Sequence, residues 1–114
     1  MIKERAGALA MSDDAMFFAH AQQIVDLAKK HRLPTVGSIE YVKAGGLLGF
    51  GVNFADLWRR AAVFVDKIFK GARPADLPVE QPSRFEVVIN AKTARDLGIT
   101  IPASLRLRAD HVVE

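Results

Sequence analysis

The sequence contains no cysteine, and this absence excludes several kinds of site. The chain can form no disulfide, no cysteine-ligated zinc or iron–sulfur site and no covalent intermediate on a thiol. Long hydrophobic runs are missing as well. Residues 1–10 combine three charged residues with a short apolar stretch, which is too short and too charged for a signal peptide or a membrane span. The sequence therefore predicts no export signal.

Signatures of catalysis are also missing. The four glycines between residues 45 and 51 do not form the dinucleotide-binding pattern, because Phe54 stands where its last glycine would be, and no Gly-Lys-Ser/Thr follows. No nucleophile elbow or His-Glu-x-x-His helix occurs. His20 and His31 lie about 16 Å apart along a helix, too far to share a metal ion. We therefore expect no enzyme activity, no metal and no cofactor.

Charge of one sign is not concentrated in the chain. The chain contains 16 Lys and Arg residues and 13 Asp and Glu residues, for a net charge of +3, and the two signs are interleaved along the sequence. The pair Arg59–Arg60 beside Trp58 could form a nucleic-acid patch, but Trp58 falls on an apolar helical stripe while the arginines fall on the opposite side. A core tryptophan with solvated arginines is the favoured interpretation, so no nucleic-acid partner is expected.

Apolar runs alternate with amphipathic runs along the chain, which indicates an α/β protein with a mainly parallel sheet flanked by helices. Residues 1–114 are expected to form a single α/β unit. The first apolar run is rich in alanine, so a helix start competes with a strand there. Three prolines between residues 74 and 82 indicate a stiff, extended segment. Strands are expected at 6–11, 33–37, 47–52 and 85–90, and helices at 14–31, 38–44, 54–70, 92–97 and 103–107.

Polar side chains follow the expected strands at the points where ligands bind in α/β proteins. Asp13 and Asp14 come after the first strand, and Asn53 comes after the third. Each of these side chains could cap the following helix, which is the favoured interpretation, or contact a ligand. Both roles are compatible with each other.

Four segments resemble the substrate-binding proteins of bacterial ABC transporters, within the type I periplasmic-binding-protein group that includes tryptophan-binding members. They are residues 44–62 (AGGLLGFGVNFADLWRRAA), 65–82 (VDKIFKGARPADLPVEQP), 85–90 (FEVVIN) and 92–102 (KTARDLGITIP). The resemblance covers nearly the whole chain. It implies a two-lobed protein that closes on a small solute and delivers it to an ABC permease.

By this resemblance the chain corresponds to the C-terminal part of such a protein, which would make it a truncated solute-binding component. Residues 5–37 and 78–97 would belong to the second lobe, and residues 47–71 to the first. The ligand cleft would be lined by the loops that follow the strands. These loops contain Ser12, Asp13, Asp14, Gly37, Ser38, Val52 and Asn53.

The resemblance also implies the ligand and the partners. A loop carboxylate suits a ligand ammonium and a helix N-terminus suits a ligand carboxylate, which together fit an amino-acid-like solute. A periplasmic location is implied, whereas the missing export signal leaves a cytoplasmic location open. Helix faces that would pack on absent elements are expected to be exposed and to drive formation of a homo-oligomer. The alternative function is a stand-alone α/β dimerisation or regulatory module without a ligand.

Overall fold

The computed structural model describes residues 6–114, and its internal contacts divide the chain into two compact units. The first unit contains residues up to Gly51 together with Glu86–Glu114, and the second contains Val52–Phe85. The predicted assignment of segments to two lobes of a larger protein stays a prediction. None of the helices within residues 6–114 has the length and hydropathy of a transmembrane span.

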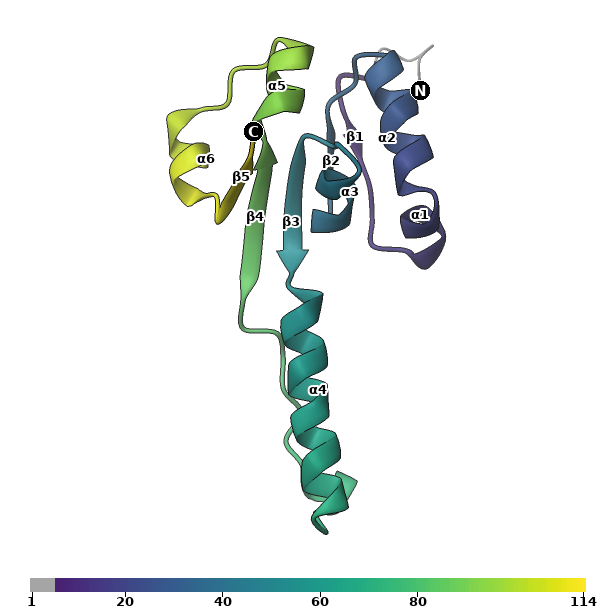
Figure 1. Cartoon of the computed structure of the whole chain (residues 1–114), viewed down its shortest axis with the longest axis vertical. Coiled ribbons are helices and arrows are strands. Elements are labelled where there is room, and N and C mark those ends of the chain that lie inside the picture. The colour runs from purple at the N-terminus through teal and green to yellow at the C-terminus, as the bar shows by residue number, and fades with distance from the viewer. Residues whose placement is uncertain (1–5) are drawn as a thin grey trace. The chain divides into compact units, whose positions relative to one another are not determined.

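Five strands form one sheet in the order in which they occur along the chain. The pairs β1–β2, β2–β3 and β4–β5 are parallel. The arrows of β3 and β4 point in opposite directions (Figure 1). The predicted α/β class with a mainly parallel sheet is therefore confirmed. The strands are β1 (Leu9–Ala10), β2 (Thr35–Gly37), β3 (Leu48–Val52), β4 (Phe85–Asn90) and β5 (His111–Val113).

Five helices belong to the first unit: α1 (Ala15–Ala19), α2 (Ala21–Lys30), α3 (Ile39–Lys43), α5 (Ala91–Leu97) and α6 (Ala103–Arg108). Helix α2 contacts α3, α3 contacts β2, and α5 contacts β5. Figure 1 shows α1 to α3 beside β1 and β2, and α5 and α6 beside β4 and β5. A small core forms where Val25 of α2 meets Tyr41 of α3, and both side chains are fully buried.

The prediction of one continuous helix over residues 14–31 is wrong. The helix breaks at His20, whose backbone (φ −111°, ψ 14°) is not helical. Helix α2 buries Ala21, Val25 and Ala28 at helical spacing. Phe17 and Leu27, on the predicted apolar face, are exposed.

Both ends of the sheet also differ from expectation. The predicted strand at 6–11 is reduced to Leu9–Ala10, because only these residues pair with the short strand β2. Strand β5 was not predicted, and its three residues are all exposed. Asp110, the residue before this strand, accepts a hydrogen bond from the Val87 N–H at 2.8 Å, and its own N–H donates to the Val87 carbonyl.

The second unit contains α4 (Phe54–Phe69) and the segment that follows it. Asn53 caps the helix, since its side-chain oxygen accepts a hydrogen bond from the Asp56 N–H at 3.2 Å. Gly71 adopts a φ of 101° just after the helix, a left-handed conformation that favours glycine. The predicted extended segment at 74–82 begins instead with a 3₁₀ turn, η2 (Pro74–Asp76), which the Arg73–Asp76 ion pair brackets.

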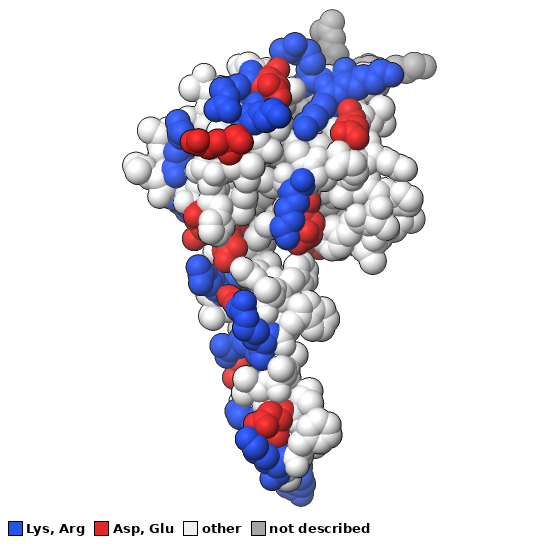
Figure 2. Space-filling view, viewed as in Figure 1, with Lys and Arg blue, Asp and Glu red and all other residues white. Residues whose placement is uncertain are grey.

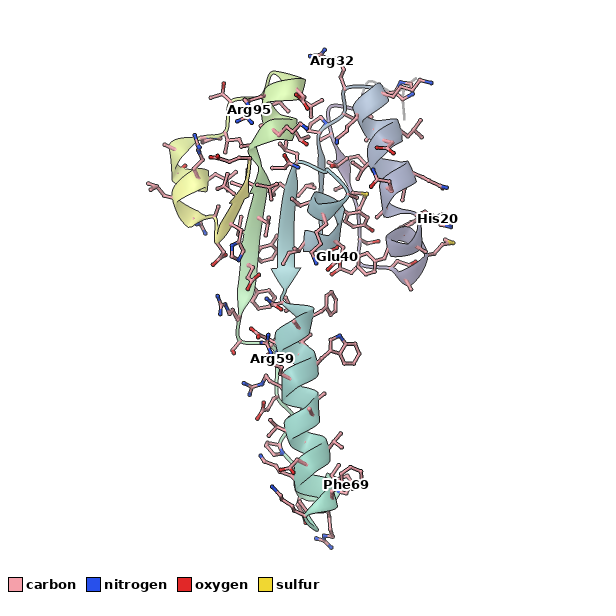
Figure 3. The ribbon with its side chains drawn as sticks, viewed as in Figure 1. His20, Arg32, Glu40, Arg59, Phe69 and Arg95 are labelled. Atoms are coloured by element: carbon pink, nitrogen blue, oxygen red, sulfur yellow. The ribbon has the colours of Figure 1, made fainter. Side chains whose placement is uncertain are left out.

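The prediction of a core tryptophan is wrong. No residue of α4 is buried, and Trp58 is 72% exposed. The apolar stripe has the predicted spacing, but the segment around Glu80 lies beside Leu57 and Phe64 rather than over Trp58. Charged side chains follow one side of α4 and uncharged ones the other (Figure 2), and Arg59 and Phe69 project from different sides (Figure 3).

Candidate functional site

A pocket of about 330 Å³ lies in the first unit at the carboxyl ends of β1 and β2. We call it the strand-end pocket. It contains four of the seven predicted ligand-binding residues, namely Ser12, Asp13, Gly37 and Ser38. Figure 3 shows Glu40 of α3 at the same end of the sheet, toward which the arrow of β3 points. The complete lining is Ala10, Met11, Ser12, Asp13, Val36, Gly37, Ser38 and Phe50.

The two adjacent aspartates of the first loop have different roles. Asp14 caps α1, because its carboxylate accepts a hydrogen bond from the Met16 N–H at 2.8 Å, and it does not line the pocket. Asp13 does line it, and no cationic side chain among residues 6–114 forms an ion pair with it. The capping interpretation is thus confirmed for Asp14, while the carboxylate of Asp13 remains available to a cationic group.

Ser38 is the most informative residue of the strand-end pocket. It stands at the N-cap position of α3 but makes no capping hydrogen bond with its side chain. The residue is only 4% exposed, and its hydroxyl oxygen has no hydrogen-bond partner within the described part of the chain. A buried hydroxyl without a partner costs about 1–3 kcal/mol, and a polar ligand atom would remove that cost.

Tyr41 of α3 lies directly beneath the pocket residues. Its hydroxyl donates a hydrogen bond to the Ser12 carbonyl at 3.2 Å, and its side chain is fully buried. Burial raises the pKa of the Tyr41 phenol above its ordinary value, and the negative charges of Asp13 and Asp14 raise it further. Tyr41 was not predicted as a site residue, because nothing in the short helical segment around it signals contact with a loop 29 residues away.

The remaining two predicted site residues lie in the second unit. Val52 and Asn53 line a different pocket of about 270 Å³ at the start of α4. Asn53 acts there as the helix cap described above. Arg59 lines the same pocket and forms an ion pair with Asp56, and Arg60 pairs with Glu80. The seven predicted site residues are therefore not in one place. Four line the strand-end pocket, two line the pocket at the start of α4, and Asp14 lines neither of these pockets.

The described residues offer no arrangement for a metal ion. Across residues 6–114, no group of three or more His, Asp or Glu side chains is placed to hold one. His20 instead shares a hydrogen bond with the Gln23 side chain at 3.2 Å. The polar chemistry of the strand-end pocket therefore consists of a carboxylate, two hydroxyl groups and the backbone around Gly37.

Comparison with known proteins identifies relatives of this fold. A model of the ABC transporter substrate binding protein family matches residues 1–113. A conserved domain protein from Vibrio cholerae is 26% identical, with a TM-score of 0.90 over 97% of this chain and 38% of that chain. An ABC domain from Streptococcus pneumoniae in complex with L-Trp is 30% identical, with a TM-score of 0.89 over 98% of this chain and 38% of that chain.

A third structure supports the fold alone. It is the ligand-free, open form of a substrate-binding protein with adhesive properties from Clostridium difficile, 20% identical with a TM-score of 0.65 over 98% of this chain and 39% of that chain. No curated protein matches the sequence. The chain spans about two-fifths of the length of the structures it matches. Because the family model extends over nearly every residue, the chain belongs to the ABC transporter substrate binding protein family.

Proposed function

We propose that this chain binds a small, amino-acid-like solute in the strand-end pocket, without catalysis, as part of an ABC-type uptake system. The observation that carries the proposal is Ser38, a residue of the pocket lining whose buried hydroxyl has no partner within residues 6–114. Asp13 adds a carboxylate without a cationic partner among these residues. Together the two side chains provide one anionic and one neutral polar contact for a ligand.

The chemistry of the lining favours a ligand with one charged end and one apolar end. The Asp13 carboxylate suits an ammonium group, and charge-assisted hydrogen bonds of this kind are the strong ones. Met11, Val36 and the half-exposed ring of Phe50 form the apolar part of the lining. The complex of the Streptococcus pneumoniae relative with L-Trp supports an aromatic amino acid as the first ligand to test.

The wider role follows from family membership and remains part of the proposal. Relatives are about two and a half times longer than this chain, so one wall of the binding site lies within it and the opposite wall would come from elsewhere. Docking to an ABC permease would require the closed, ligand-bound form. A periplasmic location is implied by the family resemblance, and fractionation of the producing cell would test it directly.

The alternative is a module that dimerises through its exposed helix and binds no ligand. The observation that favours it is the apolar stripe of α4, where Trp58 is 72% and Phe69 86% exposed. A contiguous exposed apolar surface of this kind marks an interaction site. We therefore propose that the chain self-associates as well as binding a ligand. A titration that detects ligand binding distinguishes the solute-binding function from the dimerisation module.

Calorimetric titration with L-tryptophan tests the proposed function. We expect Asp13→Asn to weaken binding about tenfold or more and Ser38→Ala to weaken it about three- to tenfold, because a charged contact is worth more than a neutral one. Indole-3-propionate has the same ring but no ammonium group, so Asp13→Asn should not weaken its binding. Asp96→Asn removes an exposed carboxylate that lies outside the strand-end pocket and should leave both affinities unchanged.

A contrary pattern would reject the proposal. Binding of neither L-tryptophan nor any other amino acid by the unaltered chain would favour the dimerisation module. Equal loss of affinity in Asp13→Asn and Asp96→Asn would show that the effect comes from net charge rather than from the pocket.

A further inference from the structure

Tyr41 joins the core of the first unit to the loop that carries Ser12 and Asp13. Its hydroxyl donates to the Ser12 carbonyl across 29 residues of sequence, at 3.2 Å. The loop is also tied to the sheet by the Met11 N–H, which donates to the Val36 carbonyl at 2.9 Å.

The ring of Tyr41 also contacts the other rim of the strand-end pocket. A Cβ atom placed on Gly37 would lie 2.6 Å from the Tyr41 Cδ2 atom and 3.2 Å from the Met11 carbonyl oxygen, so the ring packs directly on this backbone. The Tyr41 ring also lies against the ring of Phe18, with centroids 5.6 Å apart and an interplanar angle of 42°. Since the ring is fully buried among these groups, it has little freedom to move.

We propose that Tyr41 is a positioning residue for the strand-end pocket, holding the Ser12–Asp13 loop by its hydroxyl and the Gly37–Ser38 turn by its ring. The role of Tyr41 in ligand binding rests on the proposed function, whereas its contacts with the two loops are present without a ligand. Asp13 and Ser38 come from loops that are 25 residues apart in sequence. A ligand contacted by both requires that their separation be constant, and Tyr41 contacts both loops.

Tyr41→Phe isolates the hydroxyl, because the ring and its packing are retained. Thr93→Val is the matched control. Thr93 is a buried residue whose hydroxyl also donates to a backbone carbonyl, that of Gly45 at 2.8 Å, and it does not line the pocket. Both variants lose one hydroxyl-to-carbonyl hydrogen bond, so they should lose comparable thermal stability.

Two measurements on the full chain separate positioning from general destabilisation. Amide hydrogen exchange at Met11, whose N–H donates to the Val36 carbonyl, should be about three- to tenfold faster in Tyr41→Phe, with exchange in α2 and β4 unchanged, whereas Thr93→Val should leave the exchange of Met11 as it is. Calorimetry should show weaker L-tryptophan binding by a similar factor in Tyr41→Phe only. Indole-3-propionate, which has no ammonium for Asp13, should lose less affinity.

The possible outcomes distinguish failure of the positioning role from failure of the proposed function. Unchanged exchange at Met11 in Tyr41→Phe overturns the positioning role, whether or not a ligand binds. Faster exchange combined with full L-tryptophan affinity overturns it as well, because the loop position would then not matter for binding. If the unaltered chain binds no amino acid, the proposed function fails, and the exchange rates alone decide whether Tyr41 holds the loop.

Discussion

Tyr41 is the one tyrosine of the chain, so its ionisation can be followed without interference from other phenols. Burial and the charges of Asp13 and Asp14 raise its pKa above the ordinary value of 10.0. The folded state therefore holds the phenolic proton more tightly than the unfolded state does. The resulting stabilisation is fully present below pH 10.0 and is lost as the pH rises through the higher pKa of the folded protein.

Absorbance of the tyrosinate ion measures this shift. We expect the folded chain to titrate at a higher pH than the same chain in concentrated urea. Asp13→Asn and Asp14→Asn should each lower the folded midpoint, because each removes a negative charge that opposes ionisation. A folded midpoint at or below that of the unfolded chain would contradict the burial of this side chain.

Ser38 makes a prediction about stability as well as binding. Its hydroxyl has no partner within residues 6–114, so Ser38→Ala should leave the free energy of unfolding unchanged or raise it by about 1 kcal/mol. Thr35 is equally buried, but its hydroxyl oxygen accepts a hydrogen bond from the Leu47 N–H at 3.2 Å. Thr35→Val should therefore lower the free energy of unfolding by about 1–2 kcal/mol.

Urea unfolding of the two variants provides the comparison. Equal destabilisation of both would mean that the Ser38 hydroxyl already has a protein partner, and the main support for the proposed ligand site would be lost.

Some properties of single residues could be predicted from the sequence and others could not. The sequence alone cannot tell which of two adjacent aspartates before a helix is the cap. The backbone geometry makes Asp14 the cap and places Asp13 in the lining of the pocket. Ser38 was assigned to the site through family resemblance, but its unpaired hydroxyl depends on three-dimensional packing. Tyr41 was missed because its contacts join segments that are distant in sequence.

At the scale of elements, the glycines of β3 differ in ways that the sequence cannot show. A Cβ atom on Gly49 would lie 2.8 Å from Val42 Cγ2 and 2.9 Å from the Ile39 Cα atom, whereas one on Gly51 would meet nothing within 4 Å. The close approach of α3 to β3 therefore depends on Gly49. Gly51 has no such constraint.

Alanine substitution at the two positions tests this difference. Gly49→Ala should lower the free energy of unfolding by about 1–3 kcal/mol, because the neighbouring backbone cannot move aside cheaply. Gly51→Ala should be neutral or stabilising by up to about 1 kcal/mol, since it restricts the unfolded chain. Denaturant unfolding measures both, and similar losses in the two variants would contradict the close packing of α3 on β3.

Most of the element order was predictable because each strand and helix has its own periodicity and its own caps. The break at His20 was not, since the amphipathic spacing continues across it and only the local backbone shows the interruption. Strand β5 was also missed, because three exposed residues carry no alternation. The exposure of Trp58 could not be read from an apolar stripe, which indicates a buried face without showing what covers it.

At the scale of the whole molecule, the exposed stripe of α4 predicts self-association. Light scattering should give a mass above the 12.5 kDa of one chain, increasing with concentration. The double variant Trp58→Gln/Phe69→Gln should return the mass to that of one chain. Val79→Gln is the control, because Val79 is 98% exposed but lies outside the helix.

Fluorescence of Trp58, the one tryptophan, gives a second readout of the same surface. Its emission should shift to shorter wavelength as the chain associates, since the indole leaves water. A mass of 12.5 kDa at every concentration, with constant emission, would contradict self-association through α4.

A nitrogen-edited NMR titration of the chain with L-tryptophan tests whether the strand-end pocket binds an amino-acid-like solute. This method detects weak binding, which suits a pocket that is open on one side. We predict saturable shifts of the backbone signals of Ser12, Asp13, Gly37 and Ser38, which are smaller in Ser38→Ala. Binding in this pocket would be contradicted if neither L-tryptophan nor any other amino acid caused a saturable shift. It would also be contradicted if the shifts were confined to residues outside the pocket.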